Sequence, residues 1–399
     1  MPGFTLPDFA LSPTDLQHAS LAFAVVFLAI AFGLGRRMVR DLFAHVMSSR
    51  GGKGKFRCGL PIRAGDGAVG RDGEVPVLVQ RLVQERRWDE MAELMRRAAA
   101  DTALYGNGVR LSHVVIDAAL APIRTAIKAP YGRRGDDRCL NRLLTPFREA
   151  ARDARGSSEI CALTALALIE AGWAAHGALD GRAPTEAGTE AFHELLREAD
   201  GWLKHADPDA AITVYMAKAN YMTGFVQPNP VAALSDRFSR WVMVDPTDSH
   251  PYEQRALHIM PGWYGTFEDV EALCDRAIRA TGKQIGDGAY ARIMARLSAY
   301  VDLRQIPGYS HQKISVALGD LIERTGTQAA ANHWAAWALA QGLDETPRTL
   351  VSRFLREVHL DEWSPEGGYA EFYGLYARSR SVKRQPAAKA KPGSGALPA

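Results

Sequence analysis

The stretch that decides the fold is RALHIMPGWYGTFEDVEAL, from Arg255 to Leu273. Its apolar residues follow a helical spacing on both sides of an interruption rich in proline and glycine. Pro261 is expected to end the first helix, because proline cannot donate the backbone hydrogen bond that would continue it. Thr266 can cap the second helix, with Asp269 three residues on as its capping partner. The stretch therefore predicts two helices joined by a corner, whose structural residues are Pro261, Gly262, Gly265 and Thr266.

The same corner carries side chains that suit recognition, namely Arg255, His258, Trp263 and Tyr264. In a structural interpretation, the two aromatic rings fill the space between the helices and their polar tips find hydrogen bonds. In a second interpretation, the four residues form a patch that binds a protein or peptide, because aromatic and arginine side chains dominate binding hot spots. Catalysis by His258 is a third interpretation, with no partner acid or nucleophile close by in the sequence. We prefer the first interpretation and keep the four residues as candidate partner-binding residues.

The rest of the chain, from about Val75 onward, shows the same helical period. The segment VPVLVQRLVQERRWDEMAELMRRAAADT reads as a helix, a tight turn at Arg86–Arg87 and a second helix. Pro208, Pro230 and Pro246 stand where helices are expected to begin or end. No run alternates between apolar and polar residues for more than four residues, as an exposed strand would. We therefore predict an all-α body, residues 77–378, made of helical pairs in an array.

The segment RWVMVDPTDSHPYEQRALHIMPGWYGTFEDVEALCDRAIRAT resembles a degenerate tetratricopeptide pair. Leu257, Pro261, Trp263, Gly265 and Thr266 also resemble the Leu-x-x-x-Pro-x-Trp-x-Gly-Ser/Thr signature of a bacterial family of unknown function. The second resemblance covers roughly Trp241 to Leu343. It implies helical repeats and no established chemistry. Gly262 stands where that family is expected to have a basic residue, which weakens a ligand-binding role at this position.

An uncharged run, HASLAFAVVFLAIAFGLG, precedes the body. It approaches the length that a helix needs to cross about 30 Å of hydrocarbon. Two acids and no base come before it, and three arginines follow by position 40, which by the positive-inside rule keeps the following side in the cytoplasm. A buried core helix is the alternative. We predict a short tail (1–16), a single transmembrane anchor (17–35) in a bacterial inner membrane, and a cytoplasmic body.

Residues 36–76 are expected to be a linker that is first basic and then rich in glycine. Its basic part, 36–57, suits contact with anionic lipid. The linker contains GDGAVG at 65–70, a match to a dinucleotide-binding pattern, but we expect neither the strand before it nor the helix after it that this site needs. Residues 379–399 are basic and rich in proline, alanine and glycine, which predicts a disordered tail.

Charge and cysteine content exclude several classes of function. The middle of the chain, residues 64–377, holds 34 bases and 42 acids, which argues against a specific nucleic-acid partner. The four cysteines have no zinc-ligand spacing, so no metal and no cofactor are expected. The sequence favours a membrane-anchored scaffold that binds a protein or peptide partner, and an α-helical enzyme with a cleft site is the alternative. The two differ in whether charged groups converge in one deep pocket.

Overall fold

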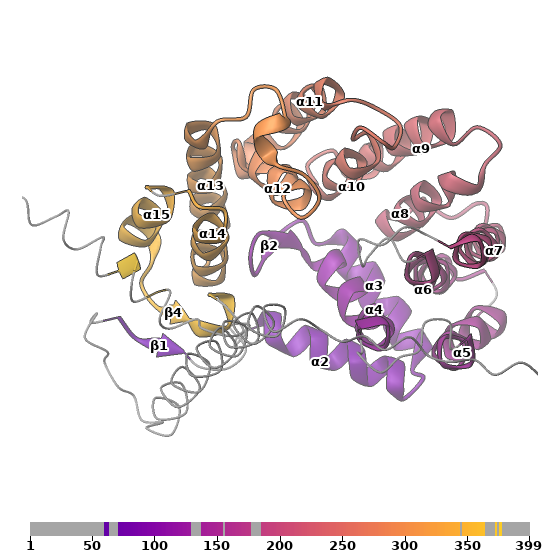
Figure 1. The fold of residues 1–399 in the computed structure, drawn as a ribbon. Coiled ribbons are helices and arrows are strands. Elements are labelled where there is room, and N and C mark those ends of the chain that lie inside the picture. Colours follow the sequence, from indigo (N-terminus) through magenta and orange to yellow (C-terminus); the bar gives the residue numbers. More distant parts are fainter. Residues whose placement is uncertain are drawn as a thin grey trace, which may run out of the picture.

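The computed structural model describes residues 60–63, 71–128, 137–154, 156–176, 185–343, 345–363, 372 and 375–376. Within these residues the chain is mostly helical, as predicted (Figure 1). The predicted anchor at 17–35, the tails at 1–16 and 379–399, and most of the linker at 36–76 lie outside the described residues.

The elements up to the middle of the chain are short strands followed by longer helices. In chain order they are β1 (Ile62–Arg63), α2 (Arg71–Gln84), α3 (Trp88–Ala100), β2 (Leu104–Tyr105), β3 (Val109–Arg110), α4 (Leu111–Lys128), α5 (Asp137–Asp153), α6 (Ser158–His176) and α7 (Glu186–Leu203).

The second half combines short helices of nine residues with helices of up to 19 residues. They are α8 (Val214–Met222), η2 (Thr223–Val226), α9 (Pro230–Val244), α10 (His250–His258), α11 (Phe267–Ile285), α12 (Gly288–Leu297), η3 (Leu303–Gln305), α13 (His311–Thr325), α14 (Gln328–Ala340), α15 (Thr346–Phe354), β4 (Val358–His359) and η4 (Leu360–Glu362).

Successive helices pack as neighbours and together form an arc. Along the chain α5 packs on α6, α6 on α7, α8 on α9, α11 on α12 and α14 on α15. Helices two apart also touch, so that α6 meets α8 and α10 meets α12. Figure 1 shows α5 to α14 curving around α3, α4 and β2, which lie inside the arc. One continuous hydrophobic core runs through both parts, from Val79 to Leu375.

Two pairs of two-residue strands complete the fold. β2 and β3 form an antiparallel hairpin, and β1 pairs in parallel with β4 from the other end of the described chain. Runs of two residues carry no alternating pattern, so period-based reasoning passes over them. The β1–β4 pair joins two residues inside the predicted linker (36–76) to the last turns of the helical body.

The predicted linker ends earlier than expected. α2 begins at Arg71 and contains Pro76, although the sequence predicts a linker up to residue 76. Val79 and Leu82 of α2 are buried, and the helix packs on α4, so apolar burial offsets the one backbone hydrogen bond that Pro76 removes. A strand and a helix therefore do flank residues 65–70. However, β1 pairs with β4 alone, so the described residues do not form the sheet of a dinucleotide-binding unit.

The helix α6 is apolar on all sides. Among the described residues it is the one helix long and apolar enough to cross a membrane, a property that core helices of soluble proteins share. Most of its residues are buried, and it packs against α5, α7 and α8. This surrounding explains its composition, since a helix that is covered on every side needs no polar face.

The fully buried Asn332 fastens the C-terminal end of the body to α14. Its Nδ2 donates to the carbonyls of Gln328 and Glu357 at 2.8 and 3.0 Å. Its Oδ1 accepts from the backbone of His359 at 3.0 Å and from the Trp363 indole at 2.9 Å. Both donors and both lone pairs of the amide are therefore used.

Replacing this amide should leave several buried polar groups without partners. We expect Asn332→Ala to lower the free energy of unfolding by about 2–4 kcal/mol, since each unpaired buried group costs about 1–3 kcal/mol. Asn229→Ala is the matched control, because Asn229 is exposed and only caps α9; it should cost about 1 kcal/mol. Urea denaturation of both variants measures the difference, and equal losses would contradict the role of Asn332.

Candidate functional site

The hairpin, residues 101–110, is held inside the helical arc through its main chain (Figure 1). Four of its carbonyls accept hydrogen bonds from side chains of α11, α12, and the start and middle of α14. The bonds run from Gln284 to Thr102 (2.9 Å), from Arg292 to Gly108 (2.9 Å), from Thr327 to Gly106 (2.5 Å) and from Trp334 to Asn107 (2.9 Å). These donors recognise a backbone rather than particular hairpin side chains.

One hairpin residue has to be glycine. Gly108 has a φ of +98°, in the region that side chains disfavour. A Cβ atom on Gly108 would lie 3.0 Å from Thr325 Oγ1 and 3.2 Å from Leu321 Cδ1. The hairpin therefore approaches α13 as closely as a main chain can.

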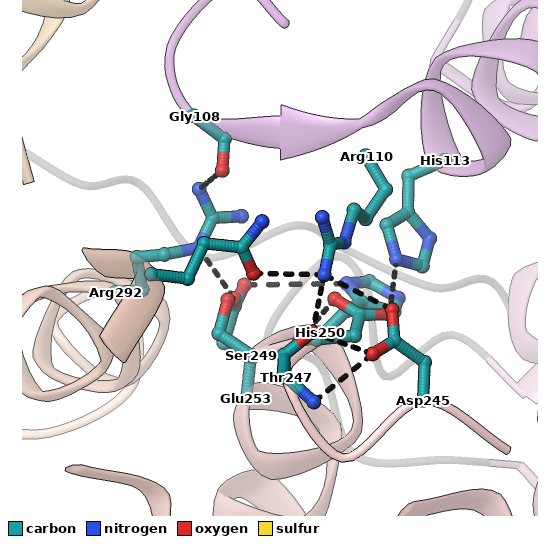
Figure 2. Close-up of polar contacts among 11 residues, drawn as sticks. Gly108, Arg110, His113, Asp245, Thr247, Ser249, His250, Glu253 and Arg292 are labelled. Atoms are coloured by element: carbon teal, nitrogen blue, oxygen red, sulfur yellow. Dashed lines mark hydrogen bonds and ion pairs between the residues drawn. The ribbon is translucent and has the colours of Figure 1, made fainter. Parts of the chain in front are cut away.

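Beside the hairpin lies a largely buried set of polar side chains, called the polar cluster below (Figure 2). It comes from β3, α4, the α9–α10 loop, α10, α11 and α12. Its members are Arg110, His113, Asp245, Thr247, Asp248, Ser249, His250, Glu253, Gln284 and Arg292.

The loop between α9 and α10 is shaped by its own two acids. Asp245 Oδ1 accepts from the backbone and the hydroxyl of Thr247 at 3.0 and 2.7 Å. Asp248 Oδ1 accepts from the backbone of His250 at 3.0 Å, at the start of α10. Each aspartate thereby keeps its Oδ2 free to reach across to β3 or α4.

Arg110 binds the Oδ2 atom of Asp245. Its side chain is buried, and its Nη2 lies 2.6 Å from Thr247 Oγ1, 2.8 Å from Gln284 Oε1 and 3.1 Å from Asp245 Oδ2. Its Nε and Nη1 are buried and have no hydrogen-bond partner among the residues that the structure describes. A hollow lined by Arg110 and Arg292 has space for about one water molecule. It is too small for an organic substrate.

The Oδ2 atom of Asp248 lies 2.7 Å from Nε2 of His113, which is on α4. The His113 ring lies against that of His250, with 4.1 Å between ring centroids. Burial raises the pKa of Asp248, but His113, the His250 backbone and Arg110 outweigh it and bring that pKa below its usual value. Burial lowers the pKa of His250 well below its usual value, and the positive charges around it act in the same direction.

A buried ion pair joins α10, α12 and the hairpin. Arg292 Nε lies 2.6 Å from Glu253 Oε1, which also accepts from Ser249 Oγ at 2.8 Å. The other end of the same guanidinium donates to Gly108 O. Since buried charges need partners, Glu253 and Arg292 fix the spacing of the two helices and hold the hairpin against them.

The polar cluster is thus arranged for holding rather than for reaction. Its charged groups are paired with one another, and its hollow is small. Within the described ranges, no group of three or more histidine, cysteine or acidic side chains could hold a metal ion.

The corner between α10 and α11 has the backbone features that the sequence predicts. Thr266 and Asp269 form a capping box, with Thr266 Oγ1 accepting from the Asp269 backbone at 3.2 Å and Asp269 Oδ2 accepting from the Thr266 backbone at 2.9 Å. Gly262 has a φ of +87°. A Cβ on Gly265 would lie 2.5 Å from the carbonyl of Ile259. α10 ends at His258 and the turn follows, with Pro261 exposed in it.

The four candidate partner-binding residues are not presented together at the surface. Trp263 is 42% exposed, whereas His258 is only 4% exposed and bonds through Nδ1 to Tyr221 Oη at 2.7 Å. Tyr264 is half-buried, and Arg255 keeps Nη1 buried. The His258 ring therefore faces α8 instead of solvent, and the partner-binding role of the four residues stays a prediction. The expectation that Trp263 fills the corner holds only in part.

Aromatic rings connect the corner with the polar cluster. From Trp263 the ring of His258 is 6.1 Å away, Tyr221 follows at 5.5 Å and Trp241 at a further 5.4 Å. Trp241 in turn lies 5.8 Å from His250. The two sets of residues thus belong to one packed unit centred on α10.

The sequence does not show which residues connect β3 and α4 to the α9–α10 loop. Arg110 and His113 meet the α9–α10 loop across about 135 positions, and neither stands in a recognised motif. The sequence signal near the contact is VDPTDSHP, whose aspartate, serine and proline residues are typical of a helix start. In α14 the residue that reaches the hairpin is Trp334, whose indole donates to the carbonyl of Asn107.

Two tryptophans provide a test of the corner. Trp241 is 1% exposed, so we expect Trp241→Ala to cost about 3–5 kcal/mol of stability, as for other buried large aromatics. Trp263→Ala should cost only about 1–2 kcal/mol, because much of that ring is already in water. Denaturant unfolding of both variants measures the gap. A Trp263→Ala loss equal to that of Trp241→Ala would show that the ring is buried in solution.

Stability should fall as the pH drops below about 6.5. Burial, Arg255 and Arg296 lower the pKa of His258 from 6.5 to about 3, so the unfolded chain binds a proton that the folded chain excludes. Between these values, His258 should remove about 1.4 kcal/mol of stability per pH unit.

His258→Asn should make that fall shallower by about the same amount, because asparagine does not titrate there. The exposed His311→Asn is the control. Denaturation across a pH series is the measurement, and identical slopes for wild type and His258→Asn would contradict the burial of a neutral His258.

Comparison with known proteins does not add a relative to this picture. No family model, no curated protein and no solved structure matches the chain. The function has therefore to be inferred from the contacts described above.

Proposed function

We propose that this protein is a membrane-anchored helical-repeat scaffold that binds a protein or peptide partner at the cytoplasmic face. The observation that carries this proposal is the way the hairpin is held. Side chains from α11, α12, and the start and middle of α14 donate to four main-chain carbonyls of the hairpin, three of them in its turn at residues 106–108. Main-chain hydrogen bonds of this kind give affinity for a peptide, and adjacent surfaces for its side chains give specificity.

The arrangement of the helices supports the same proposal. Successive pairs, with α6 on α8 and α10 on α12, fit a tetratricopeptide-like array, and such arrays present an inner surface made by one helix of each pair. The resemblance of residues 241–343 to a bacterial repeat family of unknown function is part of the proposal. An enzyme with a cleft site is less favoured, because the hollow of the polar cluster holds about one water molecule.

The membrane placement rests on the sequence. Residues 17–35 supply the anchor, and the basic residues 36–57 suit anionic lipid in the cytoplasmic leaflet. β1 then joins β4, so the chain enters the body beside its C-terminal elements. We propose that this brings the body close to a bacterial inner membrane, with the Trp263 ring exposed for a partner.

Trp263 is the proposed apolar contact for the partner. It is the exposed end of the aromatic rings that pack around α10. A tryptophan fixed by such neighbours loses little side-chain freedom on binding, and that is typical of a hot spot.

The test is an affinity capture from detergent-solubilised membranes with the full chain as bait. Trp263→Ser should weaken the captured complex by at least about 2 kcal/mol, or about 30-fold in Kd. Met243→Ser is the matched control, because Met243 is also exposed, at 70%, but lies on α9; it should bind as wild type. Failure to capture any protein in stoichiometric amount, or equal binding by the two variants, would contradict the proposal.

A further inference from the structure

The exposed ring of Trp263 is held in place by rings from three other elements. Its centroid lies 5.9 Å from that of Trp173 on α6, 6.0 Å from that of Phe225 on η2 and 6.1 Å from that of His258 on α10. The Trp263 side chain nevertheless remains 42% exposed. Part of a large aromatic ring is therefore open to a partner, and its position is set before any partner binds.

No cation of the described chain covers this ring. Among the described residues, arginine and lysine side chains stack on Phe238, Tyr290 and Phe354, and none stacks on Trp263. Arg255, the nearest base in the sequence, lies over Phe238 of α9, 5.9 Å from that ring centroid. Tryptophan is the strongest aromatic partner for an arginine or lysine head group. The exposed part of Trp263 is thus available to a cation from outside.

Two histidines near the ring add no positive charge at neutral pH. Burial, followed by nearby arginine charges, lowers the pKa of His258 to about 3. Burial also lowers the pKa of His176, whose ring lies 5.7 Å from that of Trp173. Neither histidine therefore repels a cation at Trp263.

Two helix starts that carry acids and no bases flank Trp263. The first turns of α11, residues 267–275, contain no Lys or Arg, and their acids are Glu268, Asp269, Glu271 and Asp275. The first turns of α7, residues 186–194, also contain no Lys or Arg, and their acids are Glu186, Glu190 and Glu194. Phe192 of α7 lies 4.7 Å from Trp173, which itself contacts Trp263. The first base on α7 is Arg197, about one turn after these acids.

Several of these acids have no basic partner. Those that are exposed and form no ion pair within the described residues are Glu186, Glu190, Glu194 and Glu268. By contrast, Asp269 caps its own helix, and Asp275 lies 3.9 Å from Lys313. The surroundings of Trp263 are therefore negative, in line with the excess of acids over bases in residues 64–377.

We propose that the corner at Trp263 binds a basic segment of the protein partner, with a Lys or Arg side chain stacked on the tryptophan and further bases opposite the acids of α7 and α11. This inference rests on the proposed function and names the chemistry of its partner. The aliphatic stem of such a side chain covers apolar surface, and its charged head stays over the ring face and in contact with water. Charge complementarity of this kind steers the encounter and selects the partner.

A short segment is long enough for these contacts. From Trp263 over Trp173 to Phe192, successive ring centroids are 5.9 and 4.7 Å apart. Phe192 is buried against α6, so the exposed glutamates of α7 lie about one helix diameter, roughly 10 Å, beyond it. An extended segment of about six residues, at about 3.3 Å per residue, spans this distance.

The test is a selection of random short peptides on the full chain in detergent, from which peptides that also bind Trp263→Ser are removed. The remaining peptides should be rich in Lys and Arg, and their binding should weaken as salt is added. Trp263→Leu keeps an apolar side chain but should weaken binding at least about fivefold, because the aromatic face is lost. Trp263→Phe keeps an aromatic face and should weaken binding only about twofold.

A second pair of variants tests the acids. Glu194→Gln with Glu268→Gln removes one acid on each side of the ring and should weaken the same peptides about threefold at low salt. Glu74→Gln with Asp89→Asn is the matched control, because it makes the same change in charge at exposed positions of α2 and α3. The control should bind as wild type, and melting curves check that every variant is folded.

Trp263-dependent peptides without Lys or Arg would overturn this inference and leave the scaffold proposal standing. Equal losses with Trp263→Leu and Trp263→Phe would do the same, because an apolar contact would then explain the binding. So would binding at least about tenfold tighter to a chain without residues 379–399, because the chain's own basic tail would then be the occupant. A selection that yields no Trp263-dependent peptide would overturn both this inference and the scaffold.

Discussion

The guanidinium of Arg292 is the constraint on which the inner part of the structure depends. It is buried between the Glu253 carboxylate and the main-chain carbonyl of Gly108. A buried charge is tolerated only when its hydrogen bonds are satisfied, so α10, α12 and the hairpin must keep their positions together. Removing one of the three partners would leave a charge or a carbonyl unpaired in a region that admits about one water molecule.

This constraint explains why many side chains of the polar cluster form hydrogen bonds with backbone atoms. Gln284, Thr327 and Trp334 add further donors to the hairpin, and Asp245 and Asp248 first order their own loop before they reach Arg110 and His113. Helices alone can slide along apolar faces, whereas directional bonds to a fixed main chain select one register. The hairpin therefore fixes the positions of α11, α12 and α14 relative to one another.

The sequence predicts what depends on local chemistry. The helical period gave the mostly helical body, and the capping residues gave the corner at Thr266 and Asp269, because both signals lie within a few positions of one another. The predicted linker runs past the start of α2. Pro76 and the glycines indicate a linker, and the sequence does not show that Val79 and Leu82 are buried where α2 packs on α4.

The polar cluster could not be predicted in the same way. The pairs made by Arg110 and His113 join residues more than a hundred positions apart, such as His113 and Asp248, and a single sequence shows no link between them. The burial of His258 could not be predicted for a related reason. It depends on the tertiary contact with Tyr221, 37 positions away in the sequence.

The hairpin also decides which part of the inner surface a partner could use. It lies against α11 to α14, where helix side chains donate to its carbonyls, and the start of α4 covers the His250 end of α10 through His113. None of the nine residues of α10 is exposed, which leaves the exposed ring of Trp263 at the following corner for a partner. Because α10 carries Glu253 on the hairpin side, a partner that contacts Trp263 would meet a corner already fixed by the Arg292 ion pair. A rigid helix of this kind presents its contacts without further ordering, which reduces the entropy lost when a peptide binds.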